Sequence, residues 1–81
     1  MTIQEIENKV REFLVDELEI EENKIQPDAR LKEDMGIDSL EVVDVVVLAD
    51  NAFGIKIKPE DFKTIKTLSE FCEFIKSKME A

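Results

Sequence analysis

The segment DSLEVVDVVVLADNAFG, residues 38–54, determines the fold class, because its composition fits either a strand or a helix. Its five closely spaced Val favour a strand, since branching at the β-carbon restricts side-chain rotamers in a helix. Against this, Asp38 and Glu41 stand at the spacing of a capping box, Gly54 lies where a helix C-terminal glycine would lie, and no turn signal interrupts the stretch between. We therefore predict a helix from Ser39 to Phe53. Its continuous core-facing side is expected to comprise Val43, Val46, Ala49 and Phe53.

Amphipathic helices are predicted on both sides of this segment. Thr2 and Glu5 have capping-box spacing, and apolar residues then recur with a helical period, which predicts a helix from Thr2 to Leu18. Thr67 and Glu70 repeat the spacing before a last helix. The apolar stripe of that last helix comprises Leu68, Phe71, Cys72, Ile75 and Met79.

The segments between these helices complete the predicted fold. Pro59 is a suitable first residue for a short helix through Phe62. Residues 19–37 lose the helical period and form an unusually long connection for so small a domain, so the connection must be held by packing. The isolated apolar residues expected to hold it are Ile20, Ile25, Leu31 and Ile37. We predict an all-α fold in a single domain over residues 1–81: a small four-helix bundle, with three longer helices, one short helix and a long loop between the first two helices.

The composition limits the function classes. The chain has 20 Asp and Glu against 11 Lys and Arg, a net charge of −9, which argues against nucleic acids and anionic membrane surfaces and favours basic patches on partner proteins. The charge is uneven, because residues 1–54 hold 15 acidic and 5 basic residues whereas residues 55–81 hold 5 and 6. With one Cys, no secretory signal and no long apolar run, we expect a cytoplasmic protein without a membrane span. We also expect a monomer.

Side chains suited to catalysis are scarce. There is no His to act as a base, and Ser39 lacks the Gly-x-Ser-x-Gly turn of a hydrolase nucleophile. Paired acids such as Glu33 and Asp34 lack the pattern of a calcium loop, so we expect a solvated surface and no metal site. Cys72 lies on the apolar stripe of the last helix and is expected to be a core residue.

Ser39 differs from these residues in its position. As the first residue of a helix, its hydroxyl is expected beside unpaired backbone N–H groups and the positive end of the helix dipole, a location that favours a phosphate group. On this evidence alone the simpler interpretation is preferred, in which Asp38 caps the helix and Ser39 is merely a tolerated polar residue.

The neighbouring sequence changes that preference. Residues 35–41, Met-Gly-Ile-Asp-Ser-Leu-Glu, closely resemble the Gly-x-Asp-Ser-Leu motif of acyl carrier proteins, in which the serine carries 4′-phosphopantetheine. In that family the serine opens the second helix, and a Phe-Gly-Ile-x-Ile segment follows, as Phe-Gly-Ile-Lys-Ile does here at residues 53–57. The resemblance to discrete, type II acyl carrier proteins covers essentially the whole chain.

The resemblance implies a carrier, not an enzyme. A phosphopantetheinyl transferase would move the arm from coenzyme A onto Ser39, and the arm's thiol would hold acyl intermediates as thioesters for acyl-transferring, condensing and modifying enzymes with basic docking patches. Partner contacts are expected at Asp38, Leu40, Glu41, Asp44, Val47, Asp50, Asn51 and Ile57. The walls of an acyl pocket are expected at Val43, Val46, Leu48, Ile65, Leu68 and Phe71. For Leu40 and Val47, additional core beneath the long loop is the alternative.

Two departures bear on the pathway. The family's second helix commonly ends in a run of acids, whereas residues 49–52 contain one, and Lys56 and Lys58 stand where acids are frequent. A carrier for a specialised acyl pathway is therefore an alternative to one for fatty-acid biosynthesis. The alternative function is an unmodified acidic helical adaptor that binds basic protein partners. A hydrolase that uses Ser39 is the weakest hypothesis.

Overall fold

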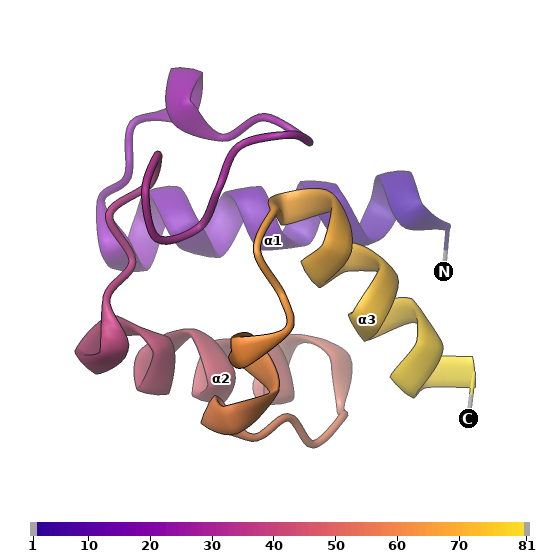
Figure 1. Ribbon diagram of the computed structural model, residues 1–81. Coiled ribbons are helices and arrows are strands. Elements are labelled where there is room, and N and C mark those ends of the chain that lie inside the picture. The colour runs from indigo at the N-terminus through magenta and orange to yellow at the C-terminus, as the bar shows by residue number, and fades with distance from the viewer. Residues whose placement is uncertain (1, 81) are drawn as a thin grey trace.

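The computed structural model describes residues 2–80, which form three α-helices and two short 3₁₀ turns (Figure 1). In chain order they are α1 (Ile3–Leu18), η1 (Glu22–Lys24), α2 (Ser39–Phe53), η2 (Pro59–Lys63) and α3 (Leu68–Glu80). The predicted all-α fold, with its long first loop and three longer helices, is confirmed. The predicted short helix is the 3₁₀ turn η2, and the long loop contains the further turn η1.

Short polar side chains set where the helices begin. Thr2 and Glu5 form the predicted capping box at α1, and the hydrogen bonds from the Thr2 N–H and hydroxyl lower the pKa of the Glu5 carboxyl. At α2, one Asp38 carboxylate oxygen accepts from the N–H groups of Leu40 and Glu41 at 3.0 and 3.1 Å. The Glu41 side chain makes no returning bond to the described backbone, so α2 has a single cap where we expected a complete box.

Gly54 ends α2 in the predicted manner. Its φ is 65°, in the left-handed region that suits glycine, and its N–H donates to the Asp50 carbonyl at 2.8 Å. The chain then turns away from the helix toward η2 (Figure 1).

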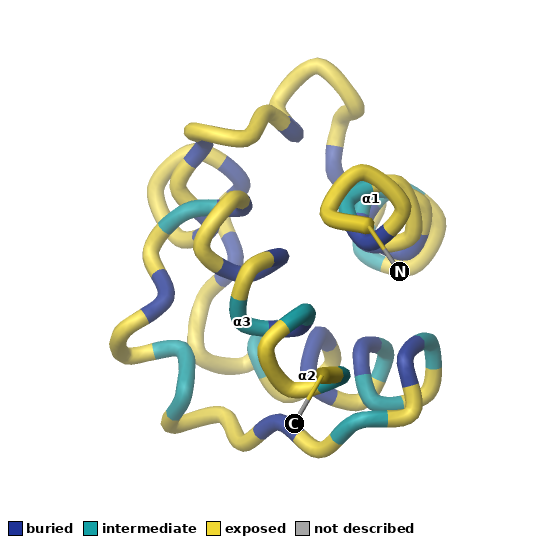
Figure 2. Tube along the Cα trace, turned by 90° about the vertical axis from the view of Figure 1, so that its right-hand side faces the viewer, coloured by how far each residue is buried: buried dark blue, intermediate teal, exposed yellow. Residues whose placement is uncertain are grey.

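The three helices bury a shared interior. Figure 2, in which α1 is seen nearly end-on, shows the buried positions of α1, α2 and α3 turned toward one another. The predicted stripe of α3 is buried from Leu68 to Ile75, whereas Met79 is partly exposed. Cys72 is a buried core residue, as expected.

The predicted core face of α2 is wrong at one position. Val43 is 50% exposed, whereas Val45 is 1% exposed and packs in the core. The buried positions Val45, Ala49 and Phe53 follow the i, i+4, i+8 spacing of one helical side, and buried Val46 flanks them. Val43 lies roughly 100° away from the centre of that side. A helix with apolar residues on most sides does not reveal from sequence which of them face the interior.

The long loop is held in two ways. The four predicted pins Ile20, Ile25, Leu31 and Ile37 are all buried, which confirms their role in packing. In addition, the loop backbone pairs with the segment before α3. The Leu31 N–H donates to the Lys66 carbonyl at 2.9 Å, and the Leu68 N–H donates to the Ala29 carbonyl at 3.0 Å. The loop is thus tied across the molecule to the start of α3.

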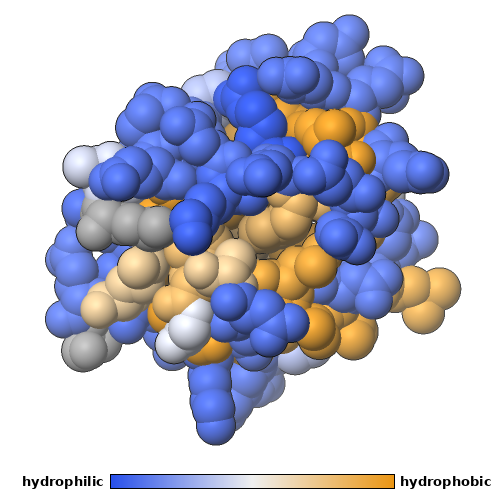
Figure 3. Space-filling model, turned by 180° about the vertical axis from the view of Figure 1, so that it is seen from behind, coloured by the Kyte–Doolittle hydropathy of each residue, from blue (hydrophilic) through white to orange (hydrophobic). Residues whose placement is uncertain are grey.

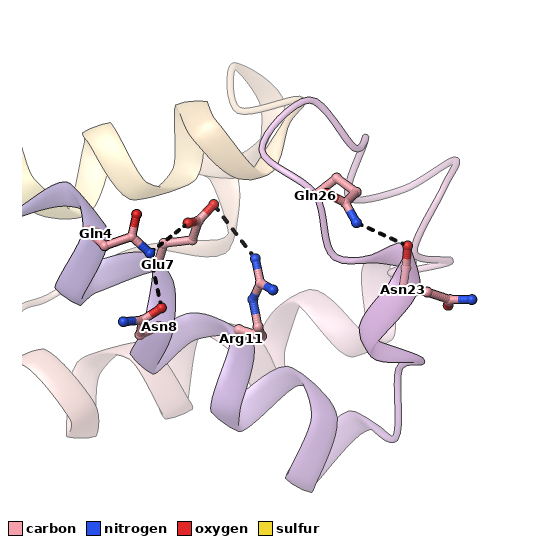
Figure 4. A network of polar contacts seen from close by, with 6 residues as sticks. All are labelled: Gln4, Glu7, Asn8, Arg11, Asn23 and Gln26. Atoms are coloured by element: carbon pink, nitrogen blue, oxygen red, sulfur yellow. Dashed lines mark hydrogen bonds and ion pairs between the residues drawn. The ribbon is translucent and has the colours of Figure 1, made fainter.

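Polar side chains cover the exterior of α1 (Figure 4). The Gln4 amide donates to Glu7 and Asn8 at 3.4 and 3.2 Å, and Glu7 lies 4.0 Å from Arg11. In the loop, the Gln26 amide donates to the Asn23 carbonyl at 3.4 Å. The hydrogen bonds of Gln4 and Gln26 are exposed, and the long contact between Glu7 and Arg11 is only partly buried, so these contacts contribute little stability. The buried apolar side chains are the main stabilising element.

A pair of matched substitutions tests the orientation of α2. Val45→Ala is expected to lower the free energy of unfolding by about 2 kcal/mol, because two buried methyl groups are lost, whereas Val43→Ala should change it by less than about 0.5 kcal/mol. Both substitutions replace Val by Ala within the same helix and so raise its helix propensity equally. The difference between their effects on the free energy of unfolding therefore reports the burial of the side chain. Urea denaturation followed by circular dichroism measures it, and equal effects of the two variants would contradict the assigned core face.

Candidate functional site

Ser39 lies at the first position of α2 and is exposed to solvent. Asp38 fixes the helix start immediately before it, so the Ser39 side chain emerges from an ordered first turn. Asp38 also occupies the N–H groups of Leu40 and Glu41, which we expected to be unpaired beside Ser39. A phosphate on Ser39 would therefore gain from the helix dipole, but would not replace Asp38 as the cap.

A groove of about 710 Å³ opens beside Ser39. The long loop, the first turn of α2, η2 and the start of α3 enclose it, so segments far apart in the sequence meet there. Its apolar lining residues are Leu31, Ile37, Val42, Pro59, Phe62 and Ile65. The Phe62 ring packs at a tilt of 42° against the buried Phe71 ring with centroids 5.1 Å apart, which anchors η2 to α3. This volume and apolar lining suit a ligand of small-molecule size.

The groove coincides with the predicted acyl-pocket residues only at Ile65. Val46, Leu68 and Phe71 are buried in the core, Leu48 is partly buried, and Val43 lies on the outer surface. Val43 therefore does not form an inner wall in this structure. The sequence reasoning missed Val42 and Phe62, although Val42 stands one helical turn after Ser39 and shares its side of α2.

The outward side of α2 exposes apolar and acidic side chains together. Leu40 is 80% exposed and Val47 52% exposed, so the alternative that they form additional core is wrong. Asp38, Asp44 and Asn51 are also exposed, and Glu41 is partly exposed. Figure 3, which views the molecule from behind, shows much of the apolar surface in the lower half of that view, the half in which α2 lies in Figure 1. We name Leu40, Val43, Asp44 and Val47 the outer α2 surface.

Two residues that we predicted to contact partners, Asp50 and Ile57, have structural roles instead. Ile57 is 4% exposed and packs in the core, so it is not available as a surface contact. The partly buried Asp50 carboxylate accepts from the Ile57 N–H at 3.0 Å and so fixes the chain after α2. The periodicity of α2 gave no signal for this bond, because its two ends belong to different segments.

The described part of the chain offers neither a reactive thiol nor a group of side chains suited to a metal ion. Burial raises the pKa of the Cys72 thiol to about 12, and the negative charges of Glu7 and Glu73 add to the effect. A thiol with this pKa is not a nucleophile at neutral pH. Within residues 2–80, no three His, Cys, Asp or Glu side chains are grouped to hold a metal ion. None of the helices described is both long and apolar enough to cross a bilayer.

Comparison with protein families identifies a match over the region that contains Ser39 and the groove. A family model described as a phosphopantetheine attachment site matches residues 8–75, which include all of α2, η2 and the groove. Carriers of this family hold phosphopantetheine and are not catalysts, in agreement with the scarcity of catalytic side chains. With most of its length matched, the chain belongs to the phosphopantetheine attachment family of carrier proteins.

Proposed function

We propose that the chain is an acyl carrier protein and that Ser39 is its attachment residue. The observation that supports Ser39 most strongly is its exposed position at the start of α2, beside the groove. Within the matched residues the other hydroxyl groups belong to Thr64, Thr67 and Ser69. The Thr64 hydroxyl donates to the Asp61 carbonyl and the Thr67 hydroxyl caps α3, whereas Ser69 is not among the residues that line the groove.

Loading would be a phosphoryl-group transfer. The Ser39 oxygen forms a bond to the phosphorus that bears pantetheine in coenzyme A, the pyrophosphate bond breaks, and 3′,5′-adenosine bisphosphate leaves. The hydroxyl proton passes to the phosphopantetheinyl transferase. This chain contributes the nucleophilic atom and its placement, and the transferase contributes the catalysis. The thiol of the arm then exchanges acyl groups as thioesters with partner enzymes.

The outer α2 surface is the proposed docking site for those enzymes. Exposed Leu40, Val43 and Val47 would contact apolar residues of the partner, and Asp44 with Asp38 and Glu41 would face Lys and Arg. Complementary charges of this kind raise the encounter rate more than the affinity. Asn51 extends the same side of the helix, whereas Ile57 is left out of the docking site because it is buried.

The acyl pathway is either fatty-acid biosynthesis or a more specialised one. Exposed Lys56 and Lys58, and the use of Asp50 to hold the Ile57 backbone, leave the C-terminal end of α2 with little acidic surface for a partner. This favours a specialised pathway.

Loading on Ser39 can be measured by mass and by thiol count. Incubation with coenzyme A and a promiscuous phosphopantetheinyl transferase is expected to add one phosphopantetheine to the wild type and to Ser69→Ala, and none to Ser39→Ala. A thiol reagent at pH 8 should detect no thiol before loading and one after it, because the thiol of Cys72 stays protonated and buried. An adduct on Ser39→Ala, or an unmodified wild type, would refute the attachment residue.

Docking can be tested by reversing one charge. Asp44→Lys is expected to lower kcat/KM for loading about tenfold at low salt, with much less loss at 0.5 M salt, because exposed charges are screened. Asp16→Lys, an equal charge change on an exposed residue of α1, is the matched control and should have little effect. Equal losses for both variants would show that net charge acts without a localised docking site. Asp50→Lys is unsuitable because it removes the bond to Ile57.

A further inference from the structure

The groove beside Ser39 has a basic rim on an acidic protein. Of the 11 basic residues in a chain with a net charge of −9, four line this groove: Arg30, Lys32, Lys63 and Lys66. They come from two segments, the long loop and the stretch around η2, which the pairing of Leu31 with Lys66 brings together. The fold thus concentrates positive charge next to the proposed attachment residue.

Three acidic residues also line the groove and keep their negative charges, so the lining carries a net charge of 4 − 3 = +1. Glu33 forms an ion pair with Arg30 at 2.7 Å, Asp38 caps α2, and Glu70 accepts from the Thr67 hydroxyl at 3.3 Å. Among the described residues, by contrast, no carboxylate forms an ion pair with Lys32, Lys63 or Lys66. Three ammonium groups at the rim are therefore available to an anion.

Between the rim residues the groove is apolar. Leu31, Ile37, Val42, Phe62 and Ile65 give it a lining without charge. A ligand that suits both features has an apolar chain and an anionic end. The phosphodiester of the arm is anionic as well, but it would be attached to Ser39 itself, next to Asp38 in the chain.

We infer that the groove retains acyl groups that end in a carboxylate, held as monothioesters of dicarboxylic acids on the arm at Ser39, in preference to uncharged acyl groups of the same length. The acyl chain lies along the apolar lining, and its carboxylate faces Lys63 and Lys66. This cargo assignment rests on the proposed function of Ser39.

Two six-carbon acyl groups provide the matched comparison. Adipoyl and hexanoyl differ only at the far end, a carboxylate against a methyl group, and share the same arm and phosphate. Each is loaded from its coenzyme A thioester by a promiscuous phosphopantetheinyl transferase, and intact mass confirms loading. The rate of thioester cleavage by hydroxylamine is then measured and divided by the rate for the same acyl group on free pantetheine.

The wild type is expected to protect adipoyl more than hexanoyl. Lys63→Met with Lys66→Met should raise the cleavage rate of the adipoyl form about fivefold, the effect of losing two exposed charge contacts, and leave the hexanoyl form unchanged. Lys24→Met with Lys56→Met makes the same charge change outside the groove and should alter neither rate. Amide NMR shifts at Leu31, Val42 and Ile65 should distinguish the adipoyl form from the unacylated holo form.

The results that would overturn the cargo assignment differ from those that would overturn the proposed function of Ser39. Equal protection of loaded adipoyl and hexanoyl, unaffected by the Lys63 and Lys66 changes, would overturn the cargo assignment and leave the carrier function intact. An equal effect of those changes on both acyl forms would assign the rim to the phosphate of the arm and also overturn it. Failure of every thioester to load would overturn the proposed function of Ser39 and this inference with it.

Discussion

The two hydrogen bonds from the N–H groups of Leu40 and Glu41 to the Asp38 carboxylate fix where α2 begins. Because they make Ser39 the first helical residue, they set the direction of every later side chain in the helix. Val45, Val46, Ala49 and Phe53 then face the interior, and Leu40, Val43 and Val47 face solvent. One capping interaction therefore separates the core from the outer α2 surface and leaves the Ser39 hydroxyl exposed between that surface and the groove.

The second constraint is the pairing of the long loop with the start of α3. A connection of this length would lose much conformational entropy on ordering, and the backbone bonds of Leu31 and Leu68, together with the buried loop residues, offset that cost. The pairing also brings Leu31 and Ile37 into the same groove lining as Phe62. The same contacts that stabilise a small domain thereby give it a ligand-sized hollow beside Ser39.

Much of this could be predicted from local patterns. The capping residues and Gly54 gave the bounds of α2, and the isolated apolar residues identified how the loop is held. The errors arose where a residue depends on distant segments. We predicted Val43 in the core, where the structure has Val45, because α2 is apolar on several sides. Ile57 is buried through packing that no local pattern indicates. The groove is lined by a loop whose path depends on backbone bonds to residues near α3.

A carrier of this family presents a covalently bound substrate and leaves catalysis to its partners. The unreactive Cys72 agrees with this division, because the thiol of the arm is then the reactive one. The most direct test is peptide mapping, by fragmentation mass spectrometry, of the protein purified from its native source. We predict a 4′-phosphopantetheine phosphodiester on Ser39, with free thiol or acyl thioester forms. Ser39 unmodified throughout the purified pool, or the adduct on another residue, would contradict the account.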